Sequence, residues 1–128
     1  EKLLLNNDIV FIDLLGNIIG DAMKSEVQSL LAELKVQFAR LYGKRLQQIS
    51  LFGSQARGDS MPGSDIDVLV VLSGEVSPAR EIEVSGDLTS TLSLEHDVVL
   101  SCIFMSADRF EKEQSPLLLN IRREGIPV

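Results

Sequence analysis

Two aspartates one residue apart, Asp65 and Asp67, open the apolar stretch DIDVLVVL (65–72), which has the composition of a strand buried on both faces. Because side chains alternate along a strand, the two carboxylates share one face, roughly 6.5 Å apart. Like charges at this spacing repel and lose solvation, and a divalent cation between them removes both penalties. Two metal ions roughly 3.5–4 Å apart could be held by this pair and a third carboxylate from a neighbouring strand.

The third carboxylate is predicted to be Asp97, because it stands at the start of another apolar stretch, HDVVLSCIFM (96–105), with the pattern of a buried strand. Asp97 would then lie at a strand end, as the aspartate pair does. Glu95 lies two residues earlier with the same alternation and is the reserve candidate. His96 would point to the opposite face, so we expect a structural or solvent-facing role for it rather than catalysis.

A phosphate-binding turn is predicted at GSQARG (53–58), directly after a predicted strand. Gly53 allows close approach of the backbone to a ligand, and Ser54 offers a hydroxyl and an N–H at the start of a helical turn, which suits phosphate oxygens. Arg57 can add a cationic fork, and Ser64 is a further nucleotide-binding candidate. A phosphate turn followed by two carboxylates predicts binding of a nucleoside triphosphate with magnesium. The G-x-x-x-x-G-K-[ST] phosphate loop is absent.

The elements that must position these residues follow from apolar spacing and from turn signals. Helices are predicted over 22–42, 78–92, 106–110 and 116–124, and strands over 45–52, 65–72 and 96–105. In the second helix we expect Ile82, Leu88 and Leu92 to face inward. This order predicts an α/β (α+β) fold, a small mixed sheet with helices packed on it.

The charge balance narrows the class of partner. The 128 residues include 12 Lys and Arg against 19 Asp and Glu, a net charge of −7, which argues against nucleic acid as a partner. The single cysteine rules out an internal disulfide and suits a reducing, cytoplasmic compartment. No zinc site can be built from one Cys and one His. We expect Cys102 and Tyr42 to pack in the core, and Arg122 and Arg123 to serve the end of the last helix.

The apolar segment 1–21 precedes the predicted domain at 22–128. Asn and Asp residues interrupt it too often for a membrane span, and no small-residue cleavage site follows a basic start. We expect this segment to pack on another chain or to close a homodimer, because an isolated tail cannot hide so much apolar surface.

The motif also carries a family resemblance. Gly53-Ser54, ten residues, and then Asp65-x-Asp67 resembles the signature of the polymerase-beta-like nucleotidyltransferase superfamily. The fuller LFGSQARGDSMPGSDIDVLVV resembles its minimal nucleotidyltransferase (MNT) branch. HDVVLSCIFMSADRFE is similar to the family's third-carboxylate strand and following turn, and SPLLLNIRREGIPV is similar to its tail, so the resemblance covers about residues 24–128.

The resemblance implies a polymerase-beta-like core and a role for each site residue. Gly53 and Ser54 would hold the triphosphate, with Arg57 supporting the phosphates or the loop. Asp65 and Asp67 would bind two Mg²⁺ ions, and Asp97 would bind the catalytic one and help activate the attacking hydroxyl. The implied reaction transfers AMP from ATP to a hydroxyl and releases pyrophosphate. Many members of the branch are antitoxins paired with a HEPN-domain ribonuclease toxin, and some add AMP to a toxin tyrosine.

Three functions therefore follow from the sequence. The favoured one is an antitoxin that acts as a protein adenylyltransferase. The second is a small-molecule nucleotidyltransferase of the aminoglycoside-modifying kind, against which the short chain argues because it offers no second domain for an acceptor pocket. The third is a binding module that masks a toxin without chemistry. The intact aspartates argue weakly against this third function, since binding alone would not need them.

Overall fold

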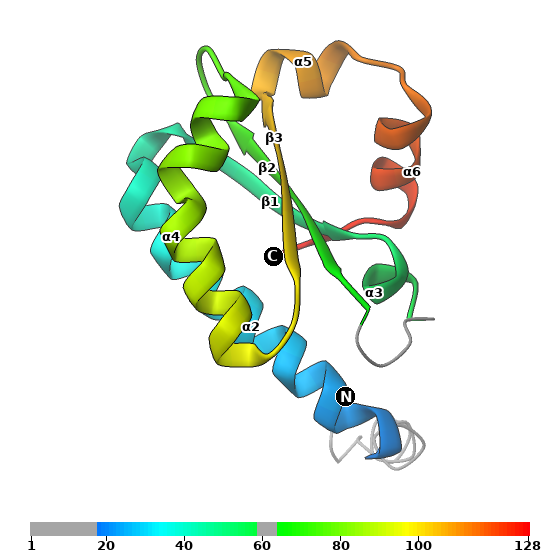
Figure 1. Ribbon diagram of the computed structural model, residues 1–128. Coiled ribbons are helices and arrows are strands. Elements are labelled where there is room, and N and C mark those ends of the chain that lie inside the picture. The colour runs from blue at the N-terminus through cyan, green and yellow to red at the C-terminus, as the bar shows by residue number, and fades with distance from the viewer. Residues whose placement is uncertain (1–17, 59–63) are drawn as a thin grey trace, which may run out of the picture.

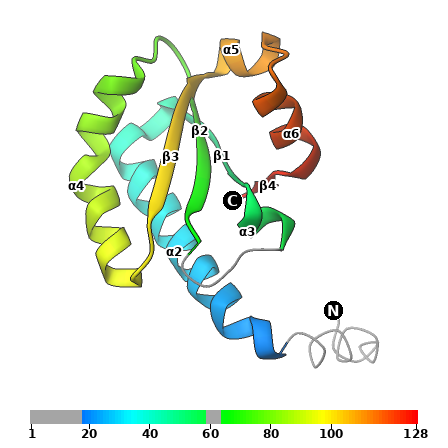
Figure 2. The same ribbon diagram turned by 45° about the vertical axis from the view of Figure 1, so that its right-hand side comes forward.

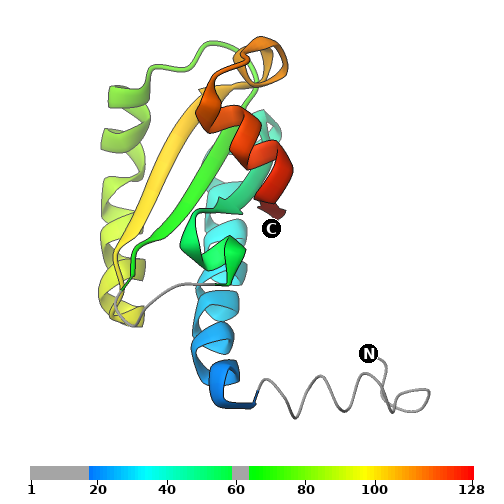
Figure 3. The same ribbon diagram turned by 90° about the vertical axis from the view of Figure 1, so that its right-hand side faces the viewer.

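The computed structural model describes residues 18–58 and 64–128, with side chains described from residue 25 onward. The packing predicted for residues 1–21 therefore concerns a segment that lies mostly outside the described part of the chain. Within the described residues, a four-stranded sheet is covered on one face by two long helices, α2 (Ile18–Tyr42) and α4 (Pro78–His96) (Figure 1). The short helix α6 (Pro116–Glu124) lies on the other face, as Figure 3 shows.

The sheet is mixed, with the strand order β3-β2-β1-β4. Its strands are β1 (Leu46–Phe52), β2 (Ile66–Leu72), β3 (Leu100–Ser106) and the two-residue β4 (Ile126–Pro127). β1 pairs antiparallel with both β2 and β4, whereas β2 and β3 run parallel and are joined by α4. The predicted fold class is confirmed; β4 was not predicted, because two residues carry no alternation to recognise.

The apolar run of β2 is continuous because both faces of this strand are covered. Val68 and Val70 pack against α2 and α4, together with Leu34 and Phe38 of α2. Leu69 and Val71 of β2 point to the other face of the sheet. There they pack with Met105, Leu118 and Ile121. Asp67 has the same alternation and so begins the α6 face of the strand.

The largest difference from the sequence prediction lies between α4 and β3. The helix predicted to end at residue 92 continues to His96, and the strand predicted over 96–105 begins at Leu100. Asp97 is the C-cap of α4, in the left-handed conformation with φ 52°, which Asp tolerates better than most residues. Backbone bonds from the N–H of Asp97 to Leu94 O and from Val98 to Ser93 O close the helix.

The inward face of α4 also differs from the prediction. Leu92 is buried, as expected, but Ile82 is 57% exposed. Its place toward the core is taken by Glu81 and Ser85, and the Ser85 hydroxyl donates to Glu81 O at 2.7 Å. The buried Glu81 carboxylate lies 3.9 Å from the guanidinium of Arg45, which precedes β1. The remaining short helix, α5 (Ala107–Lys112), begins after Ser106 as predicted.

Candidate active site

The predicted site residues converge at one end of the sheet. β1 ends there at Phe52, and β2 and β3 begin there, because β1 runs antiparallel to β2 and β2 runs parallel to β3. The one-turn helix α3 (Ser54–Arg57) follows β1 directly and stands beside the start of β2, as Figure 2 shows. The chain therefore brings the Gly-Ser turn and the aspartate pair together, as the sequence motif predicts.

Gly53 is the point of closest approach between the two halves of the motif. Its backbone has φ 78° and ψ −156°, a conformation open to glycine and to almost no other residue. A Cβ placed on Gly53 would lie 2.7 Å from Oδ2 of Asp67, so the carboxylate rests against the bare backbone of the turn. Glycine is required here both by conformation and by space.

The turn after Gly53 is a closed helical turn with its N-terminus at Ser54. The N–H of Arg57 donates to Gly53 O at 3.1 Å, and the N–H of Gly58 donates to Ser54 O at 2.9 Å. Gly58 ends the turn in the left-handed conformation, with φ 81°. The first N–H groups of such a turn have no carbonyl partner within the turn itself.

The aspartate pair places two like charges at the start of β2. Asp65 is exposed and precedes the first residue of β2, and Asp67 is half-buried in the strand. Burial, and after it the charge of Asp65, raise the pKa of the Asp67 carboxyl above its usual range. A divalent cation would reverse both effects, so two carboxylates placed beside a phosphate-type turn fit Mg²⁺ and the phosphates it carries.

The strand beside Asp67 carries a hydroxyl where a third carboxylate was expected. In the β2–β3 register Asp67 lies opposite Ser101, and partners in a parallel pair share a face. The seven residues of β3, LSCIFMS, include no Asp or Glu. Asp97 was predicted at the mouth of this strand; it lies instead on the turn before it, four residues ahead of Ser101. Any contact of Asp97 with a ligand would come from that turn.

Glu95, the reserve candidate, is drawn away from this end by the longer helix. It lies in the last turn of α4, where its carboxylate groups with Glu33 and His96. The assumption that His96 lies on a strand is wrong: it is the last residue of α4, and both ring nitrogens face carboxylates of α2. The expectation of a structural role for His96 agrees with these contacts.

The two remaining nucleotide-binding candidates flank the turn. Ser64 is half-buried directly before Asp65. Arg57, whose side chain is 44% exposed, lies 3.9 Å from Oε1 of Glu124 and so links α3 to the end of α6. In this arrangement the guanidinium is close to the site while one of its contacts is to a carboxylate of the protein.

Cys102 and Tyr42 pack in the core as predicted, whereas Arg122 and Arg123 donate to groups other than the last carbonyls of α6. Cys102 packs against the α2/α4 core, and burial raises the pKa of its thiol to about 12. Tyr42 is buried against Phe38 with ring centroids 5.6 Å apart. Arg122 donates to Phe110 O and lies over the Phe110 ring, which ties the last turn of α6 to α5. Arg123 donates to Asn120 Oδ1 at 2.7 Å.

The mixed sheet of this chain, with its Gly-Ser turn in contact with the Asp-x-Asp strand, is the arrangement that the sequence motif predicts for a nucleotidyltransferase. Residues 31–124 match the family described as "Nucleotidyltransferase domain", and the chain belongs to this family. Over the residues described here, no helix has both the length and the apolar character needed to cross a membrane.

Two curated relatives of the chain carry the name protein adenylyltransferase. The chain is 40% identical over 72 residues to MJ0604 of Methanocaldococcus jannaschii, a candidate protein adenylyltransferase; the match covers 56% of this chain and 66% of the relative. It is 33% identical over 75 residues to the protein adenylyltransferase MntA of Thermococcus cleftensis, covering 59% of this chain and 74% of MntA. The chain thus spans just under two thirds of the length of MJ0604.

Solved structures share the fold at lower identity. A candidate nucleotidyltransferase from Sulfolobus solfataricus superposes with a TM-score of 0.55 at 21% identity, covering 83% of this chain and 84% of that one. A chain of a toxin–antitoxin complex with AMP-PNP superposes with a TM-score of 0.53 at 23% identity, covering 72% of this chain and 67% of that one. Both likenesses confirm a nucleotidyltransferase fold.

Proposed function

We propose that this protein is a Mg²⁺-dependent protein adenylyltransferase that transfers AMP from ATP to a tyrosine hydroxyl of a HEPN-type toxin and so acts as its antitoxin. The observation that carries the proposal is the contact between the two halves of the motif, where Oδ2 of Asp67 rests against the Gly53 backbone at the start of the phosphate-type turn. The naming of MntA as a protein adenylyltransferase supports the reaction class.

Each site residue has a role in this proposal. Asp65 and Asp67 hold the metal ions, which neutralise the charge of the phosphates. The Ser54 hydroxyl and the N–H groups at the start of its turn would bind phosphate oxygens, with Arg57 and Ser64 as further phosphate-binding residues.

The transfer itself is a displacement at phosphorus. The acceptor oxygen forms a bond to the α-phosphorus, the bond from that phosphorus to the bridging oxygen breaks, and pyrophosphate leaves. The hydroxyl proton passes to the Asp97 carboxylate, which is proposed to reach the acceptor from the turn before β3. Asp97 is exposed on that turn and so is open to an incoming group.

A protein acceptor suits this chain better than a small molecule. The net charge of −7 favours a basic partner, and a docking protein brings its own walls to the end of the sheet and excludes water from it. Chains of toxin–antitoxin complexes are among the folds that resemble this one, including an MntA–HpeT complex that superposes with a TM-score of 0.54.

One observation favours the masking module as a second candidate. β3 holds Ser101, not a carboxylate, opposite Asp67. A hydroxyl is neutral and cannot act as a base near neutral pH, so a chain with this strand could bind a nucleotide and a toxin with little transfer.

The experiment is to incubate the protein, ATP and MgCl₂ with the HEPN-type toxin encoded beside it, and to weigh the intact toxin. AMP-sized mass increments that vanish with Asp65→Asn/Asp67→Asn support the transferase. A toxin that is inhibited but unmodified favours the masking module, and modification of an added aminoglycoside instead favours the small-molecule enzyme.

A further inference from the structure

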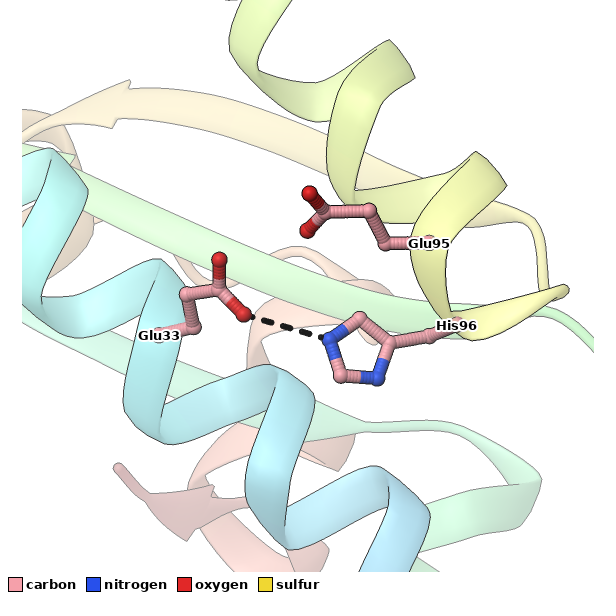
Figure 4. A group of neighbouring side chains, drawn as sticks. All are labelled: Glu33, Glu95 and His96. Atoms are coloured by element: carbon pink, nitrogen blue, oxygen red, sulfur yellow. Dashed lines mark hydrogen bonds and ion pairs between the residues drawn. The ribbon is translucent and has the colours of Figure 1, made fainter.

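We propose that this protein has a second cation site, away from the nucleotide, where the last turn of α4 meets α2. Its ligands are His96 and Glu95 of α4 and Glu33 of α2, shown in Figure 4. One ligand atom from each of the three side chains lies within 4.8 Å of the other two. The class of ligand is a divalent ion of intermediate softness, of which Zn²⁺ is the probe, because imidazole nitrogen and carboxylate oxygen are both among its ligands.

The distance between His96 and Glu33 suits such an ion. Nε2 of His96 lies 3.3 Å from Oε1 of Glu33. An ion bonded to nitrogen and oxygen at about 2.0–2.1 Å holds neighbouring ligand atoms roughly 3.3 Å apart in tetrahedral geometry. The His96 side chain is 11% exposed, so the ring is held between the helices, while the Glu33 side chain is 41% exposed and leaves a path from solvent.

A carboxylate behind the imidazole fixes its orientation. Nδ1 of His96 lies 3.4 Å from Oε2 of Glu26, which precedes Glu33 by seven residues, or two turns of α2. When the Nδ1–H donates to Glu26, Nε2 presents its lone pair to Glu33. This pairing of an outer carboxylate with a ligating imidazole is common around metal sites, where it sets the tautomer.

The same contact creates a demand for positive charge. A lone pair on Nε2 and a carboxylate oxygen are both acceptors, so at 3.3 Å they repel unless a cation lies between them. A second proton on the ring, at Nε2, would remove the repulsion between Nε2 and the Glu33 oxygen only. The third acceptor, the Glu95 carboxylate, has no share in that proton, whereas a metal ion bonds to all three. The third group therefore favours an ion over a proton.

The sequence-based exclusion of zinc considered only Cys and His as ligands. The site needs one His, because two carboxylates and a water complete a four-coordinate ion. Its effect would be to join the end of α4 to α2, directly before the turn that carries Asp97 and Val99. Val99 O accepts from the N–H of Ile66 at 2.8 Å, and Ile66 stands between Asp65 and Asp67 in the sequence.

The test is calorimetric titration of untagged, chelator-treated protein with ZnCl₂, with CoCl₂ as a spectroscopic probe. In excess MgCl₂, which competes at the aspartate pair, we expect one Zn²⁺ per chain, intense Co²⁺ absorption bands of a four-coordinate site, and a higher unfolding temperature with Zn²⁺. Affinity should fall at least tenfold in His96→Gln and in Glu33→Gln. The matched controls are Glu83→Gln, an exposed glutamate elsewhere on α4, and Asp65→Asn/Asp67→Asn; both should bind Zn²⁺ like the wild type.

Three results would overturn the proposal: no saturable binding by the wild type, equal affinity in His96→Gln, or loss of the ion in Asp65→Asn/Asp67→Asn. The last result would place Zn²⁺ at the aspartate pair instead. Since Gln at position 96 could loosen the helix contact by itself, the metal-free unfolding temperature of each variant is compared first. Glu95→Gln, at an exposed side chain, provides a ligand variant with little effect on packing.

Discussion

The carboxylates near the two ends of β2 have opposite electrostatic surroundings. Beyond the end at Leu72, Glu81 is 3% exposed, and Arg45 reaches it with an N–O distance of 3.9 Å. Arg45 also donates to Ser73 O at 3.2 Å and to Glu75 O at 2.9 Å, so the guanidinium holds the chain together where it leaves the strand. The charge at this end is satisfied by the protein itself.

At the other end, Asp67 meets influences that both oppose its charge. Burial and Asp65 raise the pKa of its carboxyl, and the neighbouring Gly53 contributes backbone but no cation. A fold that pairs Glu81 with Arg45 could have paired Asp67 in the same way. The comparison supports our proposal that the end with Asp67 binds a cation from solution, whereas the Arg45–Glu81 pair at the other end contributes to stability.

The largest effect is expected from changing both aspartates at the proposed ligand-binding end. Asp65→Asn/Asp67→Asn should lower the affinity for Mg²⁺-ATP and the rate of AMP transfer by roughly 100-fold or more, because the charges that hold the metal are lost. Circular dichroism should show an intact fold, since Asp65 is exposed and burial opposes the charge of Asp67. Isothermal calorimetry checks the affinity; equal Mg²⁺-ATP binding by variant and wild type would remove the aspartates from the site.

A change to the Arg45–Glu81 pair at the opposite end should alter the stability of the protein and not its activity. Arg45→Met leaves the buried Glu81 carboxylate without its cation and should lower the free energy of unfolding by about 2–3 kcal/mol, less than for a fully buried pair because the guanidinium is partly exposed. Urea unfolding measures the change. Adding Glu81→Leu should recover part of the loss, since the stranded charge is gone; a double variant as unstable as the sum of both singles would contradict the pairing.

A third change tests whether Asp97 acts as the third carboxylate of the proposed active site. Asp97→Asn should slow AMP transfer about tenfold, below the effect of a well-positioned base, because Asp97 lies on the turn before β3. Ser101→Asp in the same background should restore transfer, since position 101 faces Asp67 in the register. Counting bound Mn²⁺ by electron paramagnetic resonance gives a readout besides activity. Unchanged transfer in Asp97→Asn would leave this carboxylate without a role.

The contrast between the ends explains what could be predicted from sequence. The Gly-Ser turn and Asp-x-Asp strand are each local, and a short connection joins them, so their meeting followed from the motif. The boundary at Asp97 was wrong because HDVV has strand composition, whereas the backbone bonds that extend α4 depend on its packing against α2. Contacts such as Arg45 with Glu81, or Glu33 with His96, join distant segments and left no periodic signal.

The smallest expected effect concerns Asp67 alone in the metal-free protein. Asp67→Asn removes a charge that burial and Asp65 oppose, and should raise the free energy of unfolding by on the order of 0.5–1 kcal/mol at neutral pH. The sign follows from the raised pKa: between the usual value of 3.8 and the higher folded-state value, the folded wild type binds more protons than the unfolded chain. Wild-type stability should therefore fall as pH rises through this window, and the variant should lack this contribution. Saturating Mg²⁺ should shrink or reverse the difference, because the ion binds only the folded wild-type site. Thermal unfolding across pH, with and without MgCl₂, measures both; a variant less stable than the wild type in every condition would make Asp67 a structural residue and would place the two ends of β2 in the same class.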